Sequence, residues 1–323
     1  MVGAGTLSTS IQTHAFGKLI LLGEHSVVYG HSALAGAIED GVTVTVQPGA
    51  GALIVPAWKA KFTADSDGVP LARAYAAILK TLGVSAPRDF DLEAQFAIPT
   101  GAGLGSSAAL SVAVARAIAA INGIENAPVL AAALASETVI HGRPSGLDHT
   151  VSYHGGFGVF TRAEGLKPIA NGSSLAIVVG HTGRERDTKG RVARVAEILT
   201  ERESETRARF AAIETLVGRA AKAIERGSLG ELGQAMNENQ RHLEALEVSC
   251  PEIERMCAIA GDAGAVGAKL TGGGGGGCVI AIAPGREAEV ERAWQTAGFK
   301  SFRTSVGGVS GAAAETRRSE MAR

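Results

Sequence analysis

The sequence is poor in cysteine and has no long apolar run. Its three cysteines, Cys250, Cys257 and Cys278, show neither CxxC spacing nor a clustered histidine. Such a sparse, odd set disfavours a disulfide scaffold and a zinc site, so we expect a reducing, cytoplasmic setting. No uncharged apolar run reaches the roughly 18 residues that span a bilayer, and residues 1–14 lack the basic start and apolar core of an export signal. We therefore expect neither export nor membrane insertion.

An excess of charge of one sign is also missing. The chain has 31 Lys and Arg against 32 Asp and Glu, a net charge of -1. No global field favours nucleic acid or an anionic membrane, so affinity for an acidic ligand must come from a local site. Glycine, by contrast, is abundant at 43 residues and lies mostly in loops between periodic segments. Glycine is therefore used here for backbone geometry.

Length and hydrophobic periodicity predict two domains, with more strands in the first and more helices in the second. We place the boundary between residues 171 and 172, where glycine-rich loops give way to charged helices. Strands are expected at residues 11–22, 42–46, 52–55, 91–98, 157–161, 175–180, 265–270, 278–283 and 302–306. Helices are expected at residues 71–82, 106–121, 129–141, 229–246, 251–263 and 287–297, with a short one from Asp148 and one or two long ones over 192–224.

The segment IPTGAGLGSSAAL, residues 98–110, joins an expected strand to an alanine-rich helix through a loop with little side-chain bulk. The loop and its two serines comprise Pro99, Gly101, Gly103, Leu104, Gly105, Ser106 and Ser107. A helix N-terminus behind such a loop offers unpaired N–H groups and a positive dipole end to an anion. A plain glycine turn with a serine cap explains the same letters equally well. The Walker and Rossmann patterns do not fit, because no Gly-Lys follows and Ser106 stands at the third glycine position.

The segment GKLILLGEHSVVYG, residues 17–30, places a lysine inside an apolar strand. Lys18 has apolar neighbours on both faces, so its ammonium needs a carboxylate or phosphate partner. A lysine that extends from an edge strand to solvent is the less favoured interpretation. Glu24 and His25 follow where the strand should end. A solvated turn and a substrate-binding pair explain these two residues equally well.

The segment ETVIHGRPSGLDH, residues 137–149, carries two carboxylates around a tight reversal of the chain. Glu137 and His141 are one helical turn apart on the same face, and Asp148 begins the next short helix. Taken singly, a surface glutamate and an N-cap aspartate explain these residues. We assign His141 and Ser145 to support of the turn.

A run of six glycines, residues 272–277, lies between two expected strands. Six glycines cost much chain entropy for a simple hairpin. We therefore expect this loop to approach a bulky ligand closely.

Together these segments resemble the GHMP family of small-molecule kinases, and within it the mevalonate kinases. The runs GKLILLGEHSVVYG, PTGAGLGSSAA and KLTGGGGGGC match the three family signatures in order. The run IHGRPSGLDHTVSYHGG is more similar to mevalonate kinases than to galactokinases or homoserine kinases. Two residues depart from the pattern: Phe16 stands where proline is usual, and Gly273 where alanine is usual. Neither departure removes a functional side chain.

The resemblance implies an α+β protein with the two-domain GHMP kinase fold. Residues 1–171 would resemble the second domain of ribosomal protein S5, residues 172–323 would be ferredoxin-like, and the active site would lie between them. It also implies ATP and Mg²⁺ as cofactors and mevalonate as the acceptor, with no nucleic-acid or membrane partner; a homodimer is consistent with it. Another kinase of the family, for phosphomevalonate, a sugar or homoserine, and a non-catalytic ligand sensor are the alternatives.

The resemblance also assigns roles to the residues of these motifs. Asp148 matches the catalytic base, Lys18 the lysine beside it, and Ser107 and Glu137 the Mg²⁺ ligands. The positions that match the substrate pocket are Lys18, Glu24, His25, Asp148 and Thr188. The positions that match the nucleotide site are Pro99, Gly101, Gly103, Leu104, Gly105, Ser106 and Ser107 in the first glycine loop, and Gly272 and Gly274 in the second.

Overall fold

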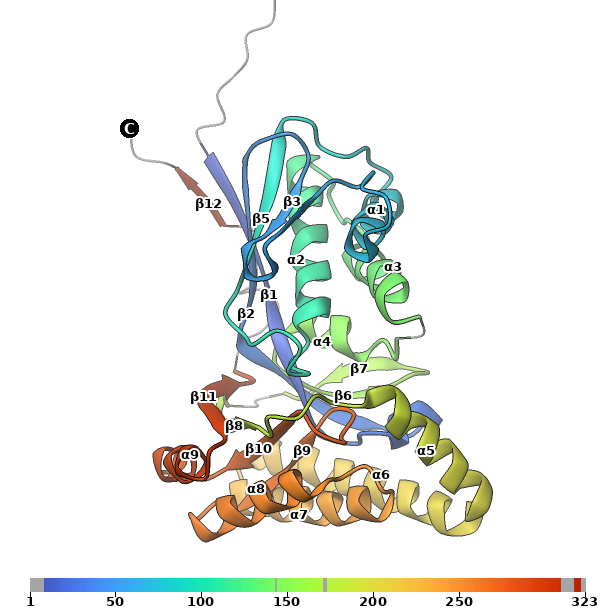
Figure 1. Ribbon diagram of the computed structural model, residues 1–323, viewed down its shortest axis with the longest axis vertical. Coiled ribbons are helices and arrows are strands. Elements are labelled where there is room, and N and C mark those ends of the chain that lie inside the picture. Colours follow the sequence, from blue (N-terminus) through green and yellow to red (C-terminus); the bar gives the residue numbers. More distant parts are fainter. Residues whose placement is uncertain (1–8, 143, 171–172, 309–316, 321–323) are drawn as a thin grey trace, which may run out of the picture.

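The computed structural model describes residues 9–142, 144–170, 173–308 and 317–320 (Figure 1). Its strands are β1 (Thr9–Leu22), β2 (Ala33–Pro48), β3 (Leu53–Val55), β4 (Ala60–Phe62), β5 (Phe90–Phe96), β6 (Phe157–Thr161), β7 (Gly165–Pro168), β8 (Leu175–His181), β9 (Gly267–Thr271), β10 (Cys278–Ile282), β11 (Lys300–Val306) and β12 (Arg317–Glu320). Its helices are α1 (Pro70–Leu82), α2 (Ser106–Ile121), α3 (Val129–His141), α4 (Leu147–His154), α5 (Thr188–Glu201), α6 (Glu203–Arg226), α7 (Leu229–Ala245), α8 (Pro251–Asp262) and α9 (Glu287–Thr296).

The described strands form one sheet that runs through both halves of the molecule. Its main path is β4-β3-β5-β2-β11-β8-β10-β9, with β1, β6, β7 and β12 attached beside it. The antiparallel pair β1 and β2 extends from the upper to the lower part of the molecule in Figure 1. Strand β11 joins the lower strands to this pair through Val306 opposite Ile38. Lys18, which lies opposite Ala37, is thereby placed where the two halves meet.

Helices cover the two halves in different ways. In the upper half α1, α2 and α3 lie on one side of the strands, whereas α6, α7 and α8 lie below the strands of the lower half (Figure 1). Helix α2, SSAALSVAVARAIAAI, is apolar on all sides and eleven of its 16 residues are buried. A helix of this kind belongs inside a core rather than on its surface. Its burial therefore holds the N-terminus of α2 at a fixed position.

Most expected elements occur, and the main error concerns β2. The strand predicted at residues 42–46 is only the second part of β2, which begins at Ala33. The sequence did not predict the first part, because ALAGAI, residues 33–38, has little β-branched character and forms a strand through its pairing with β1. The short strands β4, β7 and β12 were not predicted. The long helical run contains two helices, α5 and α6, with a break at Arg202.

The predicted domain boundary at 171/172 lies outside the described residues and stays a prediction. Within the described part of the chain, no helix is both long and apolar enough to span a bilayer.

Candidate active site

A buried lysine pairs with a carboxylate from a distant part of the sequence. Lys18 on β1 has a side chain that is 5% exposed, and its Nζ lies 3.0 Å from Oδ2 of Asp148 in the first turn of α4. The predicted need for a partner is thus confirmed. The lysine passes directly beneath the first glycine loop, residues 101–105: a Cβ at Gly105 (φ 77°) would lie 2.7 Å from Lys18 Cγ. The Lys18 amide also donates to the Leu104 carbonyl at 2.8 Å. These two contacts hold the loop and the lysine in position relative to each other.

The first turn of α2 is free to bind an anion. Its N-cap is Gly105, none of the described side chains caps it, and no acidic residue lies in this turn. The interpretation as a serine-capped turn is therefore wrong. Uncapped N–H groups at the positive end of a helix dipole attract phosphate and carboxylate groups. Ser106 and Ser107 belong to the helix itself, and the Ser107 hydroxyl donates to Oε1 of Glu137.

Glu137 on α3 is a buried carboxylate beside this helix end. Burial raises its pKa to about 7, Ser107 opposes the rise by donating to it, and the charge of Asp148 adds to it. His141 completes the cluster, with Nε2 at 3.6 Å from Oε2 of Glu137 and 3.3 Å from Oγ of Ser107. Sequence analysis assigned His141 to the turn alone. Its spacing of one helical turn from Glu137 was the signal that places it at the site.

A pocket of about 620 Å³ lies between the α3–α4 region and α5. Its lining residues are Glu137, Ile140, His141, Pro144, Ser145, Gly146, Asp148, His149, Arg186, Thr188, Lys189, Val192, Ala193 and Ala196. Both carboxylates predicted from the sequence and Thr188 thus reach one cavity, and Arg186 and Lys189 add positive charge to it. Arg184, two residues before Arg186, does not line the pocket, and its Nη1 lies 3.7 Å from Oε2 of Glu252.

Glu24 and His25 lie deeper in the structure and do not line this pocket. Glu24 is 1% exposed, forms an ion pair with the buried Lys269 on β9, and accepts a hydrogen bond from Nδ2 of Asn239 at 3.3 Å. His25 donates from Nε2 to the Gly273 carbonyl at 3.0 Å, and burial lowers its pKa to about 4. His25 therefore connects the segment after β1 to the second glycine loop, and Glu24 connects it to β9 and α7. Sequence analysis missed Lys269, although a lysine within the buried run GAKLT was the available signal.

The second glycine loop, residues 272–277, packs against the protein's own backbone. A Cβ at Gly274 (φ 75°) would lie 2.1 Å from the Val248 carbonyl oxygen, and one at Gly276 would lie 2.6 Å from that of Glu185. Close packing within the protein thus explains these two glycines without the ligand that we expected. A Cβ at Gly272 would meet no atom within 4 Å, so this end of the loop is open to a ligand.

Two family models match the chain. The model of the GHMP kinases N terminal domain matches residues 70–156, and that of the GHMP kinases C terminal matches residues 220–300. The protein belongs to the GHMP kinase family, whose members use ATP as phosphate donor. The predicted two-domain GHMP kinase fold is confirmed.

Several relatives that match most of the chain are mevalonate kinases. The chain is 36% identical over 309 residues to the mevalonate kinase of Pyrococcus horikoshii, an alignment that covers 87% of this chain and 91% of the relative. It is 35% identical to the mevalonate kinase of Aeropyrum pernix, over 85% and 89% of the two chains. The crystal structure of L. major mevalonate kinase in complex with R-mevalonate superposes with a TM-score of 0.81 at 28% identity, covering 95% of this chain and 98% of that one. The resemblance inferred from the motifs is confirmed.

Proposed function

We propose that the protein transfers the γ-phosphoryl group of ATP to the primary hydroxyl of mevalonate, giving 5-phosphomevalonate. It would do so in the cytoplasm, as a step of isoprenoid biosynthesis. The observation that carries the proposal is the 3.0 Å pair of Lys18 and Asp148, because Asp148 lines the pocket and Lys18 packs under the glycine loop that precedes the uncapped end of α2. The relatives' shared name supports the choice of acceptor.

Positioning and charge neutralisation account for most of phosphoryl-transfer catalysis, because the transition state is loose and anionic. The amides of the first turn of α2 and the first glycine loop would bind the phosphates of ATP. Asp148 would accept the proton of the attacking hydroxyl, and Lys18 would orient that carboxylate and offset charge on the transferred group. The open end of the second loop, at Gly272, would close over the nucleotide from the other half.

The residues around Glu137 fit Mg²⁺. This ion prefers oxygen ligands and is usually held by one or two carboxylates together with substrate phosphates. Ser107 and Glu137 offer a hydroxyl and a carboxylate beside the helix end, and a divalent cation would favour the ionised form of a carboxyl whose pKa burial has raised. When bound, the ion would offset the negative charge of the phosphates. The chain's own part is to present these two oxygens at a fixed position.

Two positive side chains of the pocket favour an acidic acceptor. Arg186 and Lys189 line it together with Asp148, and mevalonate carries a carboxylate that they would attract. A neutral sugar would gain nothing from these charges. A ligand sensor has no need of a base, so the presence of Asp148 beside Lys18 speaks against that alternative. A homodimer stays a prediction from the resemblance.

The test is coupled measurement of ADP release with a panel of acceptors, namely mevalonate, phosphomevalonate, galactose and homoserine, with and without Mg²⁺. We expect turnover with mevalonate that requires Mg²⁺. Faster turnover with another acceptor would reassign the substrate. Nucleotide binding without turnover on any of them would favour the sensor.

A further inference from the structure

Helix α5 forms one side of the pocket, yet few apolar contacts fix it. Thr188, Lys189 and Val192 on this helix line the pocket. Of its 14 residues only Val195 and Ile198 are buried. Burial of two side chains is a small contribution for an element that must hold a pocket at a fixed width. Other interactions must therefore determine where α5 lies.

The turn after α7 contains a residue whose backbone conformation favours glycine. Glu247 has φ 59°, and its amide donates to the Glu244 carbonyl at 2.9 Å while the Val248 amide donates to that of Leu243 at 3.1 Å. Helices commonly end this way, and the left-handed position is usually glycine because other residues are strained there. A glutamate at this position implies that its side chain makes a contribution that glycine would not.

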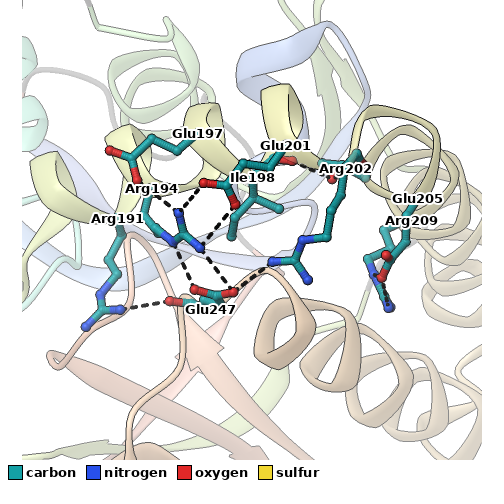
Figure 2. A network of polar contacts seen from close by, with 10 residues as sticks. Arg191, Arg194, Glu197, Ile198, Glu201, Arg202, Glu205, Arg209 and Glu247 are labelled. Atoms are coloured by element: carbon teal, nitrogen blue, oxygen red, sulfur yellow. Dashed lines mark hydrogen bonds and ion pairs between the residues drawn. The ribbon is translucent and has the colours of Figure 1, made fainter.

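Three arginines of α5 and the α5–α6 junction converge on Glu247 (Figure 2). Arg194 donates from Nε to its Oε2 at 2.9 Å, and Arg202 donates from Nη2 to its Oε1 at 2.8 Å. Arg191 donates from Nη1 to its backbone carbonyl at 2.8 Å. Arg194 also reaches Glu197 and Glu201 on its own helix. Glu247 thus connects α5 to the end of α7, with its carboxylate through Arg194 and Arg202 and with its carbonyl through Arg191.

The same turn supports the second glycine loop through its backbone. The Val248 carbonyl accepts a hydrogen bond from the Gly275 amide at 2.9 Å. This contact does not involve the side chain of Glu247. The turn therefore contacts the glycine loop with its backbone alone, and α5 with both the Glu247 carbonyl and the Glu247 carboxylate. A change of the Glu247 side chain removes only the carboxylate contacts to Arg194 and Arg202.

We propose that Glu247 is a positioning residue, whose carboxylate holds α5 through Arg194 and Arg202 and so fixes the acceptor side of the pocket. This inference rests on the proposed function, because it concerns the same pocket. Exposed ion pairs contribute little to global stability. Loss of the carboxylate is therefore expected to move α5 rather than to unfold the protein.

The decisive variant is Glu247→Gly, which removes the carboxylate and suits the backbone angle. We expect faster amide hydrogen exchange in residues 188–201, a KM for the acceptor raised about tenfold by misplacement of the pocket wall, and unchanged nucleotide affinity in calorimetric titration. Arg194→Gln leaves the pair of Arg202 and Glu247 in place and should change exchange and KM in the same direction but by less. In the double variant the effect should be smaller than the sum of the two single effects, because both single variants remove the Arg194–Glu247 pair.

Glu238→Ala is the matched control. It breaks a similarly exposed pair between α6 and α7, Arg219 Nη1 to Glu238 Oε2 at 3.0 Å, in which no residue of α5 takes part, and should leave exchange and KM as in the wild type. Unchanged exchange of residues 188–201 in Glu247→Gly and in Arg194→Gln would overturn the proposal, as would equal effects in the control. The exchange measurement needs no turnover, so absence of activity with mevalonate would overturn the proposed function alone.

Discussion

The molecule contains two buried lysines that pair with carboxylates from distant segments, and they have opposite surroundings. Lys18 meets Asp148, whose side chain is 40% exposed and lines the pocket. Lys269 meets Glu24 with both side chains at most 1% exposed, and burial lowers the pKa of Lys269. The first pair is open at its acidic end, whereas the second is sealed. The carboxylate of the open pair is accessible to a ligand in the pocket, whereas that of the sealed pair is enclosed between two segments of the chain.

The cost of burying charge explains why the two pairs have different uses. Removing a charged group from water is expensive, and a partner with further hydrogen bonds is needed to offset it. Glu24 has both, from Lys269 and Asn239. Asp148 is partly exposed to water, so its two carboxylate oxygens do not both need hydrogen-bond donors from the described residues. A carboxylate left with an unused oxygen toward a cavity is available for chemistry.

The largest expected effect is on the open pair. Asp148→Asn should lower kcat by up to about 10⁴-fold, because an amide cannot accept the proton of the attacking hydroxyl. ATP should still bind, since the glycine loop and the end of α2 are untouched. The measurement is coupled ADP release together with a nucleotide titration. A kcat near that of the wild type would remove Asp148 from the role of base.

The sealed pair should respond in stability instead. Glu24→Gln leaves the Lys269 ammonium buried without its counter-charge and should lower the free energy of unfolding by about 3–5 kcal/mol. Urea denaturation measures this loss, and turnover per folded molecule should fall far less than in Asp148→Asn. In the double variant with Lys269→Met the unpaired charge is gone, so part of the stability should return. A single variant as stable as the wild type would mean that the pair is not sealed.

The sequence predicts candidate partners for the lysine of the open pair, Lys18, but not the partner of the lysine of the sealed pair, Lys269. A lysine between apolar neighbours predicts a partner for Lys18, and two carboxylates around a chain reversal provide candidates for it. Which carboxylate Lys269 would meet depends on β1 and β9 being brought together across more than two hundred residues, which no local pattern encodes. The same limit applies to the second glycine loop, because the carbonyls that crowd Gly274 and Gly276 come from segments far away in the sequence.

The site carries a second carboxyl, Glu137, which unlike Asp148 is buried. Its substitution should have the smallest effect and the one most dependent on pH. The pKa of Glu137 is raised from 4.5 to about 7, so the folded state retains a proton there that the unfolded state has lost. Its contribution to stability is complete below pH 4.5, is lost as pH rises to about 7, and amounts to about 3 kcal/mol.

As pH rises from 5 to 8, the stability of Glu137→Gln should therefore increase relative to that of the wild type, as measured by thermal or urea unfolding without nucleotide. Partial burial lowers the pKa of His141, and a lowered histidine pKa changes stability with pH in the opposite direction, so His141→Gln is the control with reversed sign. The same Glu137 variant should need more Mg²⁺ for turnover, because one of the two proposed oxygen ligands loses its charge. If Glu137→Gln and the wild type differed in stability by the same amount at pH 5 and at pH 8, Glu137 would already be ionised in the free protein. Mg²⁺ would then have no buried proton to displace.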